Sequence, residues 1–198
     1  MLRLASTSAT RKALLTGAGL VFESSPAPID ERAEEARALG KAPEALARHL
    51  AEAKARAVSR LHPANIVIGA DQILALDSEI LHKPEGLAGA RRQLDRLRGR
   101  AHSLVSAVAL CRNGTVLFSA TDAATLTMRA FSEAERDHVL ALEGEAVLGS
   151  VGSYRLEGPS IRLFERVEGD YFTILGLPLL PLLAGLRQHA PETFERFT

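Results

Sequence analysis

The sequence predicts an α/β protein, because it contains both buried strands and an amphipathic helix. The continuous apolar run 66–68 is typical of a strand that is buried on both faces of a sheet. Apolar residues recur every three or four positions over 43–61, which predicts a helix with one buried face. Two strand-like runs, 104–110 and 116–126, are joined through Asn113-Gly114, a good hairpin turn. The 198 residues suffice for one generous domain or two small lobes.

The remaining elements follow from the same patterns. A short strand, 2–4, precedes a helix, 9–16, for which Ser8 is the expected N-cap. Ser132 and Glu135 form a capping-box pattern that opens a helix ending near residue 142. Further strands are expected at 20–23 and 161–167, and further helices at 87–97 and 177–188.

Composition argues against several classes of partner. Lys plus Arg equals Asp plus Glu at 24 each, so no bulk field attracts the chain to nucleic acid or an acidic membrane. The one basic cluster, in 91–100, lacks interleaved aromatic residues and is interpreted as a solvated helix face. We therefore expect no nucleic-acid partner.

Targeting and membrane signals are weak as well. Residues 1–15 carry Ser, Thr and Arg where a signal peptide needs an apolar core. The most apolar segment, 174–186, is too short for a bilayer span and contains two prolines. The single Cys111 cannot form an intrachain disulfide and is interpreted as a small buried hydrophobe. These features predict a cytoplasmic protein with no membrane partner.

The first candidate for chemistry is Asp71. It follows the apolar run directly after Gly69 and Ala70, two small residues that permit close backbone approach. We expect the strand to end there, and ligands of open α/β sheets bind beyond the carboxyl ends of strands. Asp71 is then a candidate catalytic carboxylate and Gln72 a neighbouring ligand contact. The alternative is that Asp71 caps a turn.

The helix beginning after Ser8 is a candidate phosphate site. Free N–H groups and the positive end of the helix dipole lie among hydroxyl donors, including Ser6, with Arg11 in the first turn. This combination suits a phosphate group. A capped helix with an exposed arginine is the alternative.

Three further charged residues fit such a site. Lys54 lies at the margin of the apolar stripe of 43–61, so its ammonium either reaches water or points into a ligand cleft. Glu31 follows a proline-rich loop and is either solvated or, if the loop folds toward Asp71, part of a divalent-cation site. Pro84 keeps the backbone of Lys83 out of a helical conformation, so the Lys83 side chain can lie over the mouth of the site.

Short motifs occur along nearly the whole chain in one order. They are LASTSATRKALL (4–15), IDE (29–31), AEAKA (51–55), GADQ (69–72), KP (83–84), GRAH (99–102), GSYRLEG (152–158) and LGLPL (175–179). In this order they resemble the Maf family of nucleoside triphosphate pyrophosphatases.

The resemblance implies a single Maf-like domain over 1–198, with a central twisted mixed sheet flanked by helices and two lobes around an active-site cleft. It also implies a homodimer. It makes Asp71 the catalytic residue and, with Glu31, the ligand of Mg²⁺ or Mn²⁺. The substrate-binding residues that it implies or supports are Ser6, Ser8, Arg11, Lys54, Gln72, Lys83 and Glu157.

The expected reaction is hydrolysis of a nucleoside triphosphate to a monophosphate and pyrophosphate. Gln72 and Glu157 resemble the branch that acts on 7-methyl-GTP, since a carboxylate accepts hydrogen bonds from the N1–H and N2–H edge of guanine and offsets the charge of N7 methylation. Lys12 and Ser106 depart from the family pattern and leave the dTTP/UTP branch open. A nucleotide-sensing regulator of cell division that does not hydrolyse its ligand is the alternative of another class.

Overall fold

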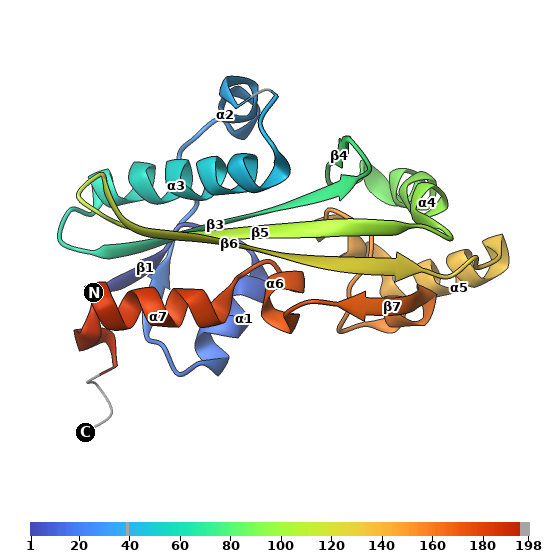
Figure 1. The fold of residues 1–198 in the computed structure, drawn as a ribbon. Helices are drawn as coiled ribbons and strands as arrows, with labels where there is room; N and C mark the ends of the chain where they lie inside the picture. The colour runs from blue at the N-terminus through green and yellow to red at the C-terminus, as the bar shows by residue number, and fades with distance from the viewer. Residues whose placement is uncertain (39, 195–198) are drawn as a thin grey trace. The chain divides into compact units, whose positions relative to one another are not determined.

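The structure is a computed structural model, and it describes residues 1–38 and 40–194. Its elements alternate between strands and helices along the chain (Figure 1). The strands are β1 (Leu2–Leu4), β2 (Phe22–Ser24), β3 (Ile66–Leu76), β4 (Glu79–Leu81), β5 (Ala101–Arg112), β6 (Thr115–Met128) and β7 (Phe164–Glu168). The α-helices are α1 (Ala9–Gly17), α2 (Glu31–Arg37), α3 (Pro43–Leu61), α4 (Gly86–Leu97), α5 (Glu133–Glu143), α6 (Tyr171–Ile174) and α7 (Leu179–His189), and the 3₁₀ helices are η1 (Gly144–Gly149), η2 (Pro159–Leu163) and η3 (Pro191–Thr193).

The strands form one mixed sheet. Their order is β2-β1-β3-β5-β6-β7, and β4 pairs with β3 outside this path. β1 lies parallel to both β2 and β3, with Leu4 opposite Ile68, whereas β4 and β7 pair antiparallel with β3 and β6. The expected α/β fold with a central mixed sheet and flanking helices is confirmed.

The chain divides into two compact units. Unit 1 comprises Met1–Gln72, Val105–Asp122 and the C-terminal segment from Tyr171, and unit 2 comprises Ile73–Leu104 and Ala123–Asp170. β3, β5 and β6 each contain residues of both units. The cleft implied by the family resemblance stays a prediction. In the part of the chain that the structure describes, no helix has the length and hydropathy needed to cross a membrane.

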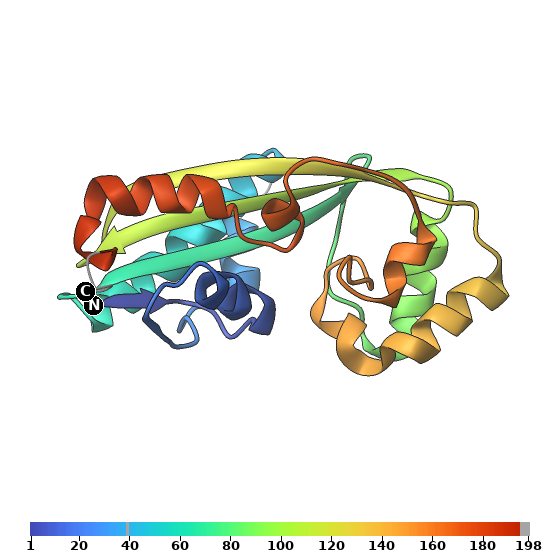
Figure 2. The same ribbon diagram turned by 90° about the horizontal axis from the view of Figure 1, so that it is seen from below.

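Unit 1 has helices on both faces of its strands. α3 covers one face, and α1 and α7 cover the other (Figure 1, Figure 2). The core between β1, β3 and α7 contains leucine and isoleucine side chains that are almost inaccessible to water, among them Leu4, Ile68 and Leu182. Burying such side chains is the main driving force for this packing.

Gly69 explains how closely α3 lies on β3. A Cβ atom at this position would lie 2.1 Å from the Ala51 carbonyl oxygen and 2.8 Å from the Ala55 Cβ. Any side chain would push the helix away, so the predicted close backbone approach is confirmed. Asp71, two residues further along the strand, projects on the same side as Gly69 because strand side chains alternate. Gly69 therefore sets the distance between Asp71 and α3.

Several predicted boundaries are wrong in informative ways. β3 does not end at Asp71 but continues to Leu76, because the polar side chains of Asp71 and Gln72 have partners within the fold, as described below. Asp77-Ser78-Glu79 has the residue types of a turn, but Glu79 does not belong to it and begins β4. The segment 161–167 is not one strand: η2 ends at Leu163 and β7 begins at Phe164.

Candidate active site

The centre of the candidate site is a partly buried ion-pair cluster on one face of β3. Lys54 Nζ donates to Asp71 Oδ1 over 2.6 Å and to Glu31 Oε2 over 2.9 Å. Lys54 and Asp71 are only 7% and 6% exposed, whereas the Glu31 side chain is about half exposed. Ala51 and Ala55, which flank Lys54 on α3, contact Gly69. The close contact between α3 and Gly69 thus brings Lys54 to Asp71.

Glu31 reaches this cluster because its loop ends in a helix. The Asp30 side chain accepts a hydrogen bond from the Ala33 amide and caps α2, so Glu31 becomes the first helical residue. Of the two adjacent acids, Asp30 is used by the fold and Glu31 faces Lys54. Glu31 is therefore not simply solvated: the structure shows the alternative in which its loop folds toward Asp71.

Arg11 lies within electrostatic range of the same carboxylates. Burial lowers the pKa of Arg11, while the charges of Asp71 and Glu31 raise it. Its guanidinium donates to the Gly176 carbonyl over 2.8 Å and to Ser6 Oγ over 3.3 Å. Gly176 has a φ of +90°, a conformation that favours glycine. Arg11 is therefore held by two groups that leave part of its guanidinium for a ligand.

Ser6 and Ser8 surround the start of α1. Ser8 Oγ accepts from the Arg11 amide over 3.3 Å and is the N-cap, as predicted. Ser6 Oγ accepts from the Ser8 amide over 3.2 Å. Both hydroxyl groups are used here as acceptors and keep their own protons for donation to an oxyanion.

Gln72 points to the opposite side of β3 from Asp71, as alternation requires. Its Nε2 donates to Ser106 Oγ over 3.1 Å and to the carbonyls of Thr173 and Ile174 over 3.2 and 2.9 Å. Ser106 Oγ also donates to the Thr173 carbonyl over 2.7 Å. The amide nitrogen of Gln72 thus holds α6, so a ligand contact from Gln72 would use its carbonyl oxygen.

The site lies where β1 stops. β1 pairs with β3 only as far as Ile68, and the pairing with β4 begins at Leu74. The backbone of 69–72 lies outside both pairings, beyond the carboxyl end of β1. This stretch of β3 thus lies just beyond the carboxyl end of a short neighbouring strand, the kind of position at which open α/β sheets bind ligands.

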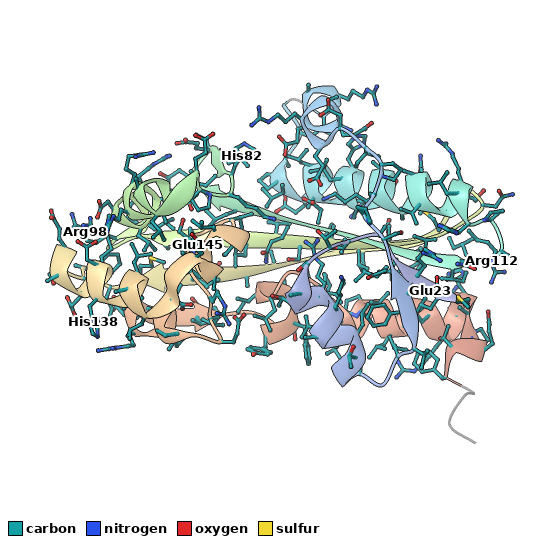
Figure 3. The ribbon with its side chains drawn as sticks, turned by 180° about the vertical axis from the view of Figure 1, so that it is seen from behind. Glu23, His82, Arg98, Arg112, His138 and Glu145 are labelled. Carbon is teal, nitrogen blue, oxygen red and sulfur yellow. The ribbon has the colours of Figure 1, made fainter. Side chains whose placement is uncertain are left out.

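The other two predicted ligand residues belong to unit 2. Lys83 is exposed and follows β4, next to His82 (Figure 3). Glu157 is exposed in the glycine-rich loop, residues 149–158, and Arg155 Nε lies 3.4 Å from its Oε1. The structure joins Glu31, Lys54 and Asp71 in one cluster and places Ser6, Ser8 and Arg11 at the start of α1, with Arg11 in electrostatic range of that cluster. Gln72 lies on the other side of β3, and contact of Lys83 and Glu157 with the same ligand stays a prediction.

Asp71 and Glu31 could hold a divalent cation. Within residues 1–38 and 40–194, no cluster of three or more His, Cys, Asp or Glu side chains is arranged to bind a metal. Mg²⁺, however, is commonly bound by one or two carboxylates together with substrate phosphates and water. A pair of carboxylates that converge on one ammonium group fits such a site.

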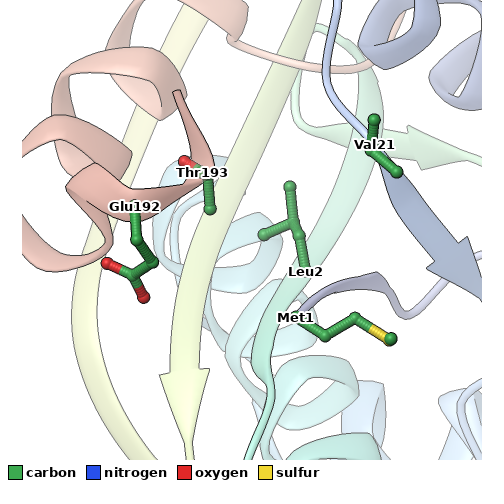
Figure 4. A pocket seen from close by; sticks show the side chains of 5 residues that line it. All are labelled: Met1, Leu2, Val21, Glu192 and Thr193. Carbon is green, nitrogen blue, oxygen red and sulfur yellow. The ribbon is translucent and has the colours of Figure 1, made fainter. Parts of the chain in front are cut away.

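Two other features fit a nucleotide less well. A small pocket lined by Met1, Leu2, Val21, Glu192 and Thr193 has a carboxylate but no lysine or arginine side chain among these described residues (Figure 4). Several arginines of the basic cluster are neutralised by acids. Arg91 pairs with Asp137, Arg96 with Glu79 and Arg100 with Asp77. These pairs agree with a solvated helix face.

Comparison with known proteins identifies the family. The Maf-like protein family model matches residues 1–189. This chain belongs to the Maf-like family. The Maf-like chain is 50% identical over 187 residues to a protein of Brucella abortus named 7-methyl-GTP pyrophosphatase, which covers 93% of this chain and 94% of that protein.

Two further relatives carry related names. A Mesorhizobium japonicum protein, also named 7-methyl-GTP pyrophosphatase, is 52% identical over 186 residues, covering 93% of this Maf-like chain and 94% of the relative. A Bradyrhizobium diazoefficiens protein named nucleoside triphosphate pyrophosphatase is 52% identical over 184 residues, covering 93% and 91%. The family resemblance noted in the sequence is confirmed.

Proposed function

We propose that this chain is a nucleoside triphosphate pyrophosphatase that prefers a modified purine such as 7-methyl-GTP. The family and the names of its relatives support the reaction class: hydrolysis of an acid anhydride that yields a nucleoside monophosphate and pyrophosphate. The observation that carries the proposal is the buried pair of Lys54 and Asp71, joined by the half-exposed Glu31 and with Arg11 in electrostatic range.

Charge balance within the cluster supports a role for a cation. Two acids and two bases cancel one another, so the cluster without ligand offers little net attraction to a polyphosphate. Asp71 and Glu31 would hold Mg²⁺ or Mn²⁺, which supplies neutralisation of phosphate oxygens and a water of lowered pKa. If the cation balanced the charges of Asp71 and Glu31, the Lys54 ammonium could donate a hydrogen bond to a phosphate oxygen.

Each residue then has a role in the reaction. Asp71 orients the attacking water toward the α-phosphorus and accepts its proton. Arg11, Lys54 and Lys83, together with the N-terminus of α1, stabilise the charge that grows on the departing pyrophosphate. The hydroxyls of Ser6 and Ser8 donate to phosphate oxygens.

Base preference would come from unit 2 and from Gln72. Glu157 is exposed, as a group that reads a base must be in the free protein. A carboxylate suits the N–H edge of a methylated guanine and repels a pyrimidine carbonyl. Two of the relatives described above are named for 7-methyl-GTP, which agrees with this assignment.

The test is product identification with a panel of canonical and methylated nucleoside triphosphates. We expect stoichiometric monophosphate and pyrophosphate, with the highest kcat/KM on 7-methyl-GTP. Asp71→Asn should lower kcat at least roughly a hundredfold at saturating Mg²⁺, whereas Asp77→Asn, in an exposed turn, should not. Tight binding without turnover would support the sensor alternative, and equal rates on dTTP would reject the base preference.

A further inference from the structure

Gln93 occupies a position where an amide is unexpected. It lies on the buried side of α4 with Ala90, Leu94 and Leu97, all of which are inaccessible to water, and is itself only 9% exposed. Burying an amide without partners costs free energy, so its hydrogen bonds decide its role. Nε2 donates to the His82 carbonyl over 2.8 Å, and Oε1 accepts from Ser153 Oγ. Gln93 thus joins two segments that are far apart in sequence.

The first segment carries Lys83. The His82 carbonyl that Gln93 binds belongs to the peptide that leads directly into Lys83, beside α4 (Figure 3). On the other side of Lys83, the Pro84 ring fixes φ, and a Cβ at Gly89 would lie 3.5 Å from Pro84. The backbone of Lys83 is therefore restrained on both sides while its side chain stays exposed.

The second segment is the glycine-rich loop that carries Glu157. Ser153 is fully buried and has a φ of 59°. The next residue, Tyr154, shares a 2.7 Å hydrogen bond with His102, and Ser160 donates to the buried Glu143 from both its amide and its hydroxyl, over 2.9 and 2.7 Å. Glu157 is thus exposed between anchored residues on either side.

We propose that Gln93 is a positioning residue that fixes the Lys83 segment and the glycine-rich loop relative to each other. The proposal rests on the proposed function, in which Lys83 contacts phosphate and Glu157 reads the base. A nucleotide has a set distance between its base and its polyphosphate, so the two contacts form together only if their segments are held at a matching separation. Gln93 binds both segments through opposite ends of one amide.

The two ends of the amide can be broken separately. Ser153→Ala removes the bond to the loop and leaves the donation to His82 intact. Gln93→Glu can still accept from Ser153 but places an oxygen against the His82 carbonyl. Gln93→Met removes both bonds at similar volume, and Arg92→Gln, an exposed neighbour on α4, is the control.

The kinetic expectation differs between these variants. Loss of one buried hydrogen bond should change the affected kinetic constant by about threefold to tenfold. Ser153→Ala should lower the ratio of kcat/KM for 7-methyl-GTP over dTTP by this factor and leave dTTP unchanged. Gln93→Glu should raise KM for both nucleotides equally. Gln93→Met should show both changes and Arg92→Gln neither.

Amide hydrogen exchange tests the same link without turnover. Gln93→Met should speed exchange in both 81–85 and 149–158, and Ser153→Ala should do so only in 149–158. If all variants merely lower Tm, with unchanged selectivity and exchange, the positioning role is rejected. If the wild-type protein shows no pyrophosphatase activity, the proposed function fails, and the exchange pattern alone decides whether Gln93 links the segments.

Discussion

Both units bury charged groups, among them Arg136 and Glu143 in unit 2, but the buried groups that hold the predicted ligand contacts differ in kind. In unit 1 the buried polar groups include charged side chains, with Lys54 placed between Asp71 and Glu31. In unit 2 the groups beneath the glycine-rich loop include neutral ones, such as Gln93 and Ser153. Buried charge is costly unless paired, whereas a satisfied neutral network mainly fixes geometry. The difference suggests that unit 1 supplies the electrostatics of the reaction and unit 2 supplies position.

The most severe test of this comparison removes Lys54. Lys54→Met should lower the free energy of unfolding by about 3–5 kcal/mol, because it leaves the Asp71 carboxylate buried without its partner. Adding Asp71→Leu should restore most of the stability but none of the activity. Arg56→Met, which breaks an exposed pair on the same helix, should cost less than about 1 kcal/mol. Urea unfolding measures all three, and equal losses for Lys54→Met and Arg56→Met would contradict the assignment.

Acid should weaken unit 2 through His102. Burial lowers the pKa of His102 to about 4 from its usual 6.5, so the unfolded chain binds a proton that the folded chain does not. The stabilisation is present above pH 6.5 and is lost as the pH falls toward 4, with a total of about 3 kcal/mol. The comparison of wild type with His102→Gln between pH 4 and 7 measures it. Parallel pH profiles for the two proteins would show that His102 does not titrate in this way.

A substitution at Gly69 tests whether the charged cluster of unit 1 depends on the close contact between α3 and β3. Gly69→Ala places a methyl group against the Ala51 carbonyl, so α3 must move, at a cost of about 1–3 kcal/mol. Because Lys54 moves with α3, kcat should fall in the protein that remains folded. Gly17→Ala, where a Cβ meets nothing within 4 Å, is the control and should be neutral. Unchanged turnover in folded Gly69→Ala would show that activity does not depend on the close contact between α3 and β3.

The smallest expected effect concerns a cap at the surface of unit 2. Ser132 and Glu135 form the predicted capping box, with both reciprocal hydrogen bonds present. Ser132→Ala should destabilise the protein by about 1 kcal/mol, measured as a lower urea midpoint, with kcat unchanged. A change in base selectivity in this variant would mean that α5 takes part in positioning the glycine-rich loop.

Local patterns in the sequence predicted local structure well. The helix over 43–61 begins and ends as expected, because a proline at its start and a continuous apolar stripe define it. Asn113 and Gly114 both have positive φ, as the predicted two-residue hairpin turn requires. Cys111 is buried, and burial raises its pKa to about 11, which agrees with its interpretation as an inert hydrophobe.

Long-range polar contacts could not be predicted in the same way. The length of β3 was underestimated because Asp71 looked like the end of a strand, and only the fold shows that Lys54 neutralises it. Gln93 was missed although it gave a signal of the same kind as Lys54: a polar residue on the apolar stripe of a helix. Its partners, His82 and Ser153, are 11 and 60 residues away in sequence, so no local pattern could name them.

The three-residue length of β1 limits how this fold can vary. Two more strand residues after Leu4 would lie opposite Gly69 and Ala70 in the register of β1 with β3 and would occupy the place where the proposed function puts a phosphate chain. Insertions there would thus be expected to abolish substrate entry while leaving the sheet intact and even longer. In this fold the shortness of an interior strand leaves the middle of its longer neighbour without a partner on that side.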